Sequence, residues 1–240
     1  MISSADLHES VLNQLGELIV LGTLPPGSVL RIEELEHRFS VSRSVVREAI
    51  RALASMGMVT AKRRVGVTVV ERSAWNTFDP QIIRWRLDGT DRLAQLRSLS
   101  ELRSAVEPVA AELAAERALP EHCAALTEAV VQMSSTGRAG DLEVYLIHDI
   151  AFHRALLQAS GNEMFASLTN VIAEVLTGRT RHNLMPEHPE ARAIRLHLEV
   201  AHAVQASDPV KARTAMTEIL CEASESIGKI AHEQEANGED

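Results

Sequence analysis

The stretch from residue 39 to residue 70, FSVSRSVVREAIRALASMGMVTAKRRVGVTVV, decides the fold of the N-terminal part of the chain. It predicts a helix over residues 43–56, because apolar side chains recur there at helical spacing. Ser42 is suited to cap the start of this helix, and Gly57 to end it. Two β-rich runs flank Gly66, and together they predict a small hairpin.

The residues before this stretch complete a small domain. Residues 4–21 and 32–39 each show the apolar spacing of an amphipathic helix. Between them lies TLPPGSVL, at residues 23–30, which reads as a turn because it holds two prolines and a glycine. Residues 40–42 join the second helix tightly to the third. Two helices joined by a three-residue turn, followed by a basic hairpin, predict a winged helix-turn-helix over residues 1–72.

Charge is distributed unevenly along the chain. The net charge is −9, but residues 38–72 hold eight basic and two acidic side chains, a local charge of +6 that leaves −15 elsewhere. A compact basic region on an acidic protein is typical of docking on nucleic-acid phosphates through one module. From charge alone, a solvated helix face explains the pattern equally well.

After residue 72 the sequence predicts helices and no strands. We expect a linker at residues 73–79, an all-helical domain for effector binding and dimerisation at residues 80–234, and a disordered tail at residues 235–240. The predicted helices span residues 80–88, 91–118, 120–134, 139–159, 162–181, 190–206 and 209–233. The expected fold class is mainly α, with an N-terminal winged helix-turn-helix and a C-terminal antiparallel helical bundle.

The composition fits a globular protein of the cytoplasm. Hydrophobic residues make up 45% of the 240 residues and charged residues 24%, which is an ordinary balance. Cys123 and Cys221 form no metal-binding spacing and indicate a reducing compartment. There is no run of about 18 apolar residues and no N-terminal secretion pattern. We therefore expect no membrane partner.

The predicted helix at residues 43–56 carries the candidate base-reading side chains. The second helix of a helix-turn-helix meets base edges in the major groove with its first turns. Arg43 and Arg47 are four residues apart and share one face, and arginine can bond O6 and N7 of guanine together. Exposed charge, or local pairing of Arg47, is the alternative. The other candidates for DNA contact are Ser44, Arg51, Arg63, Arg64 and Gly66.

The helical half carries one candidate metal site. Asp149 and His153 are four residues apart and project from one face of a predicted helix, and His197 on a later helix is a third candidate ligand. One carboxylate with imidazole nitrogens suits a divalent metal ion. The alternative is a core histidine that is capped by an aspartate and binds no metal.

The stretch 39–70 resembles the DNA-binding domain of the GntR superfamily of transcriptional regulators. The Ser-Arg, Arg-Glu-Ala, leucine and wing-glycine positions are in register. The resemblance implies binding to double-stranded operator DNA, with Arg43 and Arg47 as the leading base readers and Gly66 in the wing. Glu33 stands where some members carry an arginine that contacts DNA. The operator sequence of those members therefore cannot be assigned to this protein.

The C-terminal half resembles the all-helical FCD domain of the FadR-type branch of that superfamily. Its metal-binding members use one aspartate and three histidines, and Asp149, His153 and His197 fall on three of these positions. Ile219 occupies the fourth. The resemblance therefore implies a three-ligand divalent metal, with zinc expected and nickel or manganese as alternatives. The matching segments are residues 102–117, 149–162 and 197–216.

The resemblance also points to an anionic effector. Arg103 matches a position that lines the effector pocket in the family, and it is expected to pair with a small carboxylate. A salt bridge to Glu107, one helical turn later, is the alternative role. Residues 71–89, with Trp75 and Trp85, are similar to the sugar-acid branch of these regulators and favour a sugar acid.

These observations predict a function for the whole chain. We expect a homodimeric repressor of a sugar-acid or other carboxylate operon, released from a palindromic operator when the effector binds. A metal-dependent hydrolase with an appended winged helix is the alternative, although the sequence has no HExxH motif or placed general base. An interaction module with histidines packed in its core is a third interpretation.

Overall fold

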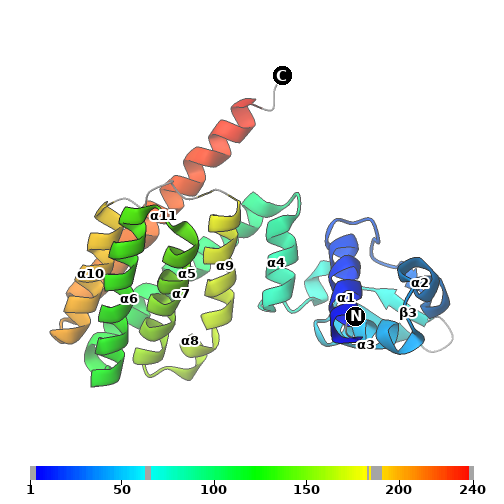
Figure 1. Ribbon diagram of the computed structural model, residues 1–240, viewed down its shortest axis with the longest axis horizontal. Helices are drawn as coiled ribbons and strands as arrows, with labels where there is room; N and C mark the ends of the chain where they lie inside the picture. The colour runs from blue at the N-terminus through cyan, green and yellow to red at the C-terminus, as the bar shows by residue number, and fades with distance from the viewer. Residues whose placement is uncertain (1–3, 63–65, 183, 185–190, 238–240) are drawn as a thin grey trace. The chain divides into compact units, whose positions relative to one another are not determined.

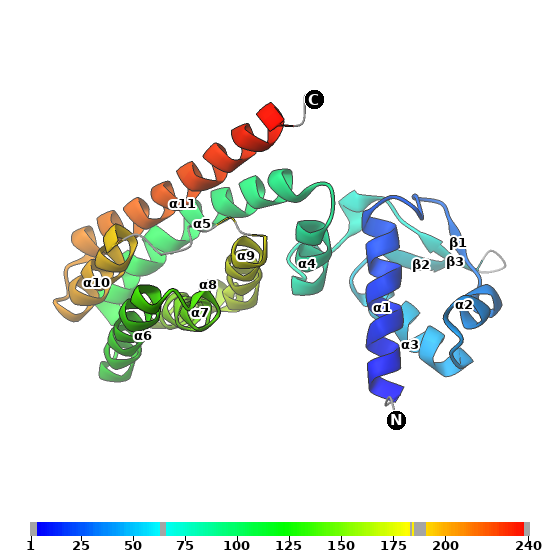
Figure 2. The same cartoon turned by 45° about the horizontal axis from the view of Figure 1, so that its top comes forward.

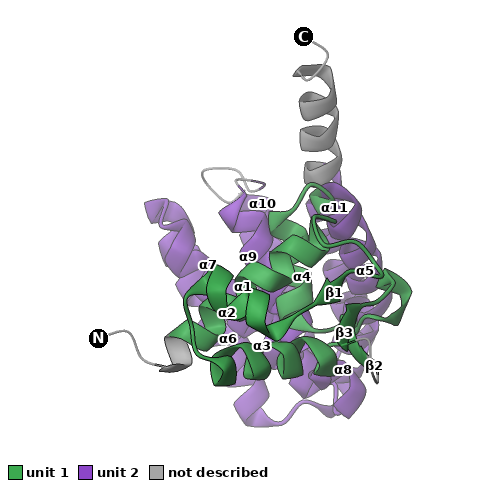
Figure 3. Ribbon diagram, turned by 90° about the vertical axis from the view of Figure 1, so that its right-hand side faces the viewer, with its two compact units in different colours: residues 1–92 green, residues 93–240 purple. Residues whose placement is uncertain are grey.

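The computed structural model describes residues 4–62, 66–182, 184 and 191–237. The chain folds as two compact units, residues 1–92 and residues 93–240, which Figure 3 distinguishes by colour. Both are dominated by helices, and the only sheet in the described parts is a small one of three strands. The predicted fold class is therefore confirmed. Among the described residues, no helix has the length and hydropathy needed to cross a membrane.

The first unit is a winged helix-turn-helix (Figures 1 and 2). The chain between α2 and α3 is the short connection that the sequence predicts, and β2 pairs antiparallel with β3 from Val59 opposite Val69 to Lys62 opposite Gly66. The elements are α1 (Ser4–Val20), β1 (Val29–Leu30), α2 (Ile32–Phe39), α3 (Arg43–Ser55), β2 (Val59–Lys62) and β3 (Gly66–Val69).

Two local predictions for this unit need correction. Residues 23–30 are not only a turn, because Val29 and Leu30 form the short strand β1, which pairs with β3. Ser42 does occupy the position before α3, but its side chain makes no capping bond to the backbone. Its hydroxyl oxygen lies 2.9 Å from that of Ser44 instead.

The helix α4 (Pro80–Asp88) belongs to the first unit and not to the second. Asp79 caps it by accepting from the backbone of Gln81 at 2.9 Å, and Pro80 fits the first helical position. The indole Nε1 of Trp85 donates to Asn13 Oδ1 on α1 at 3.1 Å. Trp85 is 3% exposed and packs in the core of the winged helix, so the unit ends at Arg92 and not before residue 73.

The second unit is a bundle of helices (Figures 1 and 2). Helix α6 packs on α7, α7 packs on α9, and α10 packs on both α6 and α11. The predicted helix over residues 162–181 is divided in two at Leu168, and the last helix extends to Asn237, past its predicted end. The elements are α5 (Arg92–Arg117), α6 (Pro120–Ala139), α7 (Leu142–Ala159), α8 (Glu163–Ser167), α9 (Thr169–Arg181), α10 (Ala191–Gln205) and α11 (Pro209–Asn237).

The core of this bundle is aliphatic, with Phe152 as its largest fully buried side chain. Nine polar or charged side chains are buried among the described residues, and six of them lie on the bundle helices α5, α7, α9 and α10 and carry ionisable groups. Burying such groups is costly unless they are paired or bind something. These six side chains therefore mark where a site is to be sought: Arg103, Glu107, Asp149, His153, Arg179 and His197.

Candidate functional site

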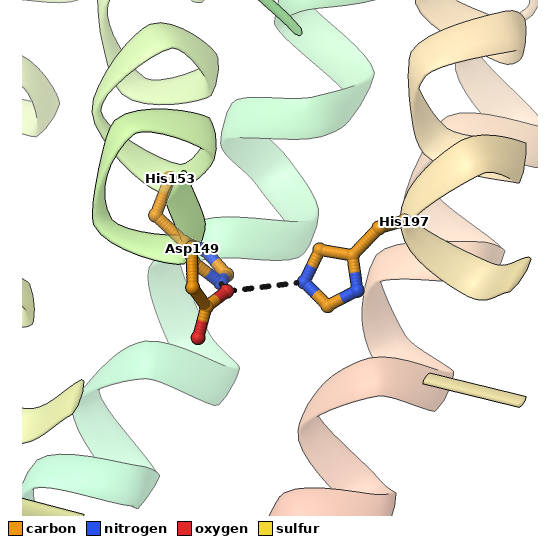
Figure 4. Close-up of side chains that lie close together, drawn as sticks. All are labelled: Asp149, His153 and His197. Atoms are coloured by element: carbon orange, nitrogen blue, oxygen red, sulfur yellow. Dashed lines mark ion pairs between the residues drawn. The ribbon is translucent and has the colours of Figure 1, made fainter. Parts of the chain in front are cut away.

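Asp149, His153 and His197 meet inside the bundle, as the sequence predicts. Asp149 and His153 project from one face of α7, and His197 points at them from α10 (Figure 4). Asp149 Oδ1 lies 3.4 Å from Nε2 of His153 and 3.4 Å from Nε2 of His197. All three candidate ligand atoms lie within 4.8 Å of one another, and all three residues are buried.

This geometry fits a divalent metal ion. Zinc bonds of about 2.0–2.1 Å in a tetrahedron place neighbouring ligand atoms about 3.3 Å apart, close to the two 3.4 Å separations found here. Asp149 Oδ1 and His197 Nε2 are buried without a hydrogen-bond partner in the described structure. Unpartnered buried acceptors that converge on one point are what a cation would satisfy.

The other ring nitrogen of each histidine lies close to an oxygen atom. Nδ1 of His153 lies 2.7 Å from Oε2 of Glu107 on α5, and Nδ1 of His197 lies 2.7 Å from the backbone oxygen of Ala193. If Nδ1 carries the proton in each ring, Nε2 keeps its lone pair for a metal. This arrangement of carboxylate or carbonyl behind a histidine is typical of metal ligands.

The buried carboxylates remain ionised. Burial works against the charge of Glu107, but Arg103 and His153 outweigh it and hold its pKa at about 2. Burial likewise opposes ionisation of Asp149, but close contacts with His153 and His197 keep its pKa well below the usual range. Burial lowers the pKa of His153, but Glu107 and Asp149 outweigh burial, so the pKa of this imidazole is raised above its ordinary value.

The fourth position of the expected ligand set is apolar. Ile219 is 7% exposed and packs in the hydrophobic core of the bundle. Neither of the nearby histidines replaces it: His148 is half-buried and His202 is exposed, and neither joins the cluster among the described residues. The described residues thus offer three candidate ligands here.

Arg103 forms the salt bridge that was the alternative to effector binding. Its Nε donates to Oε1 of Glu107 at 2.6 Å, and its Nη2 donates to Oε2 at 3.3 Å. Nη2 also lies 3.3 Å from Nε2 of His153. The guanidinium therefore borders the metal-ligand cluster while it neutralises the carboxylate that orients His153.

Two buried residues of this region were not anticipated as site residues. The sequence indicates Glu107 only as a partner for Arg103, and it assigns no role to Arg179. A signal for Arg179 was present: it follows Ile172, Val175 and Leu176 at helical spacing, on the buried face of α9. Charged residues on a buried helix face are rare and call for an explanation.

The first turns of α3 expose the predicted DNA-binding side chains. Arg43, Ser44, Arg47 and Arg51 are all exposed, as a surface that meets DNA requires. Nη2 of Arg43 is paired with Oε1 of Glu33 on α2 at 2.9 Å, and Arg51 is paired with Glu48. Arg43 is therefore held beside an acidic side chain from the first helix of the motif.

The wing is described only in part. Gly66 begins β3 with φ of 105°, a left-handed conformation that favours glycine. Arg63 and Arg64, the predicted contacts at the tip, lie outside the described residues.

Comparison with known proteins agrees with this architecture. Residues 7–69 match the family of bacterial regulatory proteins called gntR, and residues 98–221 match the FCD domain. The galactonate operon transcriptional repressor of Escherichia coli K12 is 34% identical over 162 residues, covering 67% of this chain and 70% of the relative. The HTH-type transcriptional regulator LutR of Bacillus subtilis 168 is 31% identical over 205 residues, covering 83% and 91%.

Solved structures show the same fold. A GntR protein of Streptococcus agalactiae superposes with a TM-score of 0.51 at 27% identity, over 91% of this chain and 99% of that one. McbR/YncC of Escherichia coli superposes with a TM-score of 0.55 at 22% identity, over 96% and 100%. The matched families and relatives are regulators and not enzymes, which leaves the hydrolase alternative without support. The chain belongs to the GntR family of bacterial transcriptional regulators and carries an FCD domain after its DNA-binding domain.

Proposed function

We propose that this regulator is a homodimeric repressor of a sugar-acid or other carboxylate operon, and that a small carboxylate bound beside a divalent metal releases it from a palindromic operator. The observation that carries the proposal is the buried cluster of Asp149, His153 and His197 inside the domain that follows the winged helix. A relative named as the galactonate operon repressor supports the sugar-acid class.

The three residues have distinct roles in this proposal. Asp149 supplies a carboxylate oxygen, and His153 and His197 supply Nε2, to a zinc ion or, as alternatives, nickel or manganese. Such an ion would supply positive charge for an effector carboxylate at a position that the protein leaves open. Glu107 and the backbone oxygen of Ala193 orient the two rings. Arg103 adds a guanidinium at the edge of the cluster.

The DNA-binding role is assigned to exposed side chains of the first unit. Arg43, Ser44 and Arg47 would meet base edges or nearby phosphates from the first turns of α3. Arg51 would meet a phosphate. Wing contacts are assigned to Arg63, Arg64 and Gly66. Two such units in a dimer would read two half-sites of a palindrome.

The test is a DNA-release experiment with controlled metal content. Operator fragments are selected from genomic DNA by the purified full chain, and binding is then measured by mobility shift with zinc, with chelator, and with D-galactonate or acetate. We expect release by a carboxylate from the zinc-loaded protein and no release after chelation. Binding to no fragment would refute the repressor, and identical release with and without metal would refute the metal-linked mechanism.

A second interpretation is that the histidines only pack in the core and bind no metal. It predicts the opposite result of chelation. It requires that chelation leave both thermal stability and the effector response unchanged. The convergence of two orphaned buried atoms, Asp149 Oδ1 and His197 Nε2, favours the metal site over it.

A further inference from the structure

A buried guanidinium without a hydrogen-bonded partner at Nε lies in the effector domain. Arg179 is 7% exposed, on the face of α9 that also buries Val175 and Leu176. Helix α9 packs on α7, the helix that carries two of the three metal ligands. The Nε atom of Arg179 is buried with no hydrogen-bond partner in the described structure. An arginine in this position is costly unless an anion compensates it.

The two carboxylates that act electrostatically on Arg179, Glu107 and Asp149, are directed at other groups. Glu107 is bonded through both oxygens to Arg103, and its Oε2 also faces His153. Asp149 directs Oδ1 at the two histidines. The protein thus gives a carboxylate partner to Arg103 and directs Asp149 at the imidazoles.

Arg179 interacts electrostatically with residues of the cluster and its surroundings. Burial first, and then the like charge of Arg103, lowers the pKa of Arg179 to about 10, while Asp149, Tyr145 and Glu107 act in the opposite direction. These neighbours come from α5 and α7. Tyr145, one turn before Asp149, is 3% exposed and brings a phenolic hydroxyl to the same region.

We propose that Arg179 is the principal anion-binding residue of the effector site, pairing its guanidinium with the carboxylate of a small organic acid that lies beside Asp149, His153 and His197. The inference rests on the proposed function and names the residue that recognises the effector's charge. A planar guanidinium can hold both oxygens of a carboxylate. Arg103 then has the different task of neutralising Glu107.

The test compares carboxylate binding by Arg179→Met, Arg179→Lys and the wild-type chain, all loaded with zinc. D-galactonate and acetate are titrated by calorimetry, and zinc content and thermal stability are measured in parallel. We expect the Met variant to lose about 10- to 100-fold in affinity for the carboxylate that binds, the Lys variant to lose less, and both to keep their zinc. Arg154→Met, an exposed arginine on α7, is the matched control and should behave as wild type.

Stability separates an anion-binding role from a structural one. If Arg179 awaits a ligand, Arg179→Met removes an uncompensated buried charge and melts no lower than wild type in carboxylate-free buffer. A large drop in melting temperature there, or carboxylate affinity equal to wild type, overturns the inference. Absence of wild-type binding to both carboxylates overturns it as well.

Operator binding tests the proposed function independently of the role of Arg179. If the wild-type chain binds operator and zinc but Arg179→Met still responds to the carboxylate normally, only the role of Arg179 is wrong. If the wild-type chain binds no DNA, the proposed function itself fails, whatever the calorimetry gives.

Discussion

Oε2 of Glu107 lies 2.7 Å from Nδ1 of His153, which couples a carboxylate of α5 to a metal-ligand candidate of α7. The same carboxylate takes two bonds from Arg103. A single carboxylate therefore contacts the imidazole and anchors the guanidinium beside it. Helix α5 contributes none of the three candidate metal ligands, yet the contact of Glu107 with His153 would control how one of them is presented.

Replacing Glu107 tests this control. Glu107→Gln retains the shape but removes the charge, so we expect zinc affinity to fall by about 10- to 100-fold. The buried Arg103 also loses its counter-charge, and breaking such a pair costs about 3–5 kcal/mol of unfolding free energy. Zinc affinity is measured by competition with a chromophoric chelator on protein shown to be folded by circular dichroism.

The control for this substitution lies on the same helix. Glu112→Gln removes a partly exposed carboxylate paired with Arg213 at 2.6 Å, and exposed pairs contribute about 1 kcal/mol at most. It should leave zinc affinity unchanged. Equal zinc affinity in Glu107→Gln and wild type would remove Glu107 from the metal site.

His197 is the ligand candidate whose removal is cleanest to interpret. It is the only member of the cluster on α10, and without it only two ligands remain on α7. We expect His197→Ala to lose its zinc on gel filtration, and the rise in melting temperature on zinc addition to disappear. His202→Ala, an exposed histidine on the same helix, should keep one zinc per chain. A fully loaded His197→Ala protein would exclude this ligand.

Local sequence patterns predict most elements of the fold, because the formation of a helix or hairpin depends mainly on residues that are close in sequence. The apolar spacing of residues 43–56, together with Gly57, predicts the helix α3. The strand β1 could not be predicted in this way. Val29 and Leu30 are too short a stretch to show the alternation of apolar and polar residues, and they follow a turn-rich segment. The domain boundary was misplaced because α4 looks like any amphipathic helix. What assigns it to the first unit is the packing of Trp85 on α1, a contact between residues far apart in sequence.

The residues of the candidate site also differ in how far the sequence alone predicts them. Asp149 and His153 could be paired from their spacing alone, since an interval of four places two side chains on one helix face. His197 needed the resemblance to a known family as well, because nothing local says which helix α10 faces. Arg179 was overlooked because its meaning depends on which face of α9 is buried and on what lies across from it.

Arg43 and Arg47 should carry operator specificity. Each is exposed at the start of α3, and loss of a bidentate base contact costs about 1–3 kcal/mol, which is about 5- to 150-fold in specific affinity. Arg43→Ala and Arg47→Ala should each lower binding to the selected operator toward that of unrelated DNA, in mobility-shift titrations at fixed salt. Arg138→Ala, an exposed arginine on α6, should change nothing. Retained specificity in both variants would assign base reading elsewhere.

Gly16 should be required for the packing of α4 on α1. A Cβ added there would lie 2.5 Å from ring atoms of Trp85, and the indole is fixed by burial and by its bond to Asn13. Gly16→Ala should therefore lower the free energy of unfolding by about 1–3 kcal/mol, despite the better helix propensity of alanine. Urea denaturation measures this. Glu17→Ala, exposed on the same helix, should stay within about 0.5 kcal/mol of wild type, and an equal stability of Gly16→Ala would show that the indole can move aside.

Ile219 should set how open the metal site is. Placing a histidine at this buried position supplies the ligand that the family resemblance leads one to expect, so Ile219→His should bind zinc about tenfold tighter or more. Without metal the imidazole is a buried polar group in an aliphatic core, which should cost about 1–3 kcal/mol of unfolding free energy. The two effects have opposite signs, so thermal melts with zinc and with chelator should diverge more in the variant than in the wild-type chain. A melt that drops equally under both conditions would mean that the side chain at residue 219 does not reach the cluster.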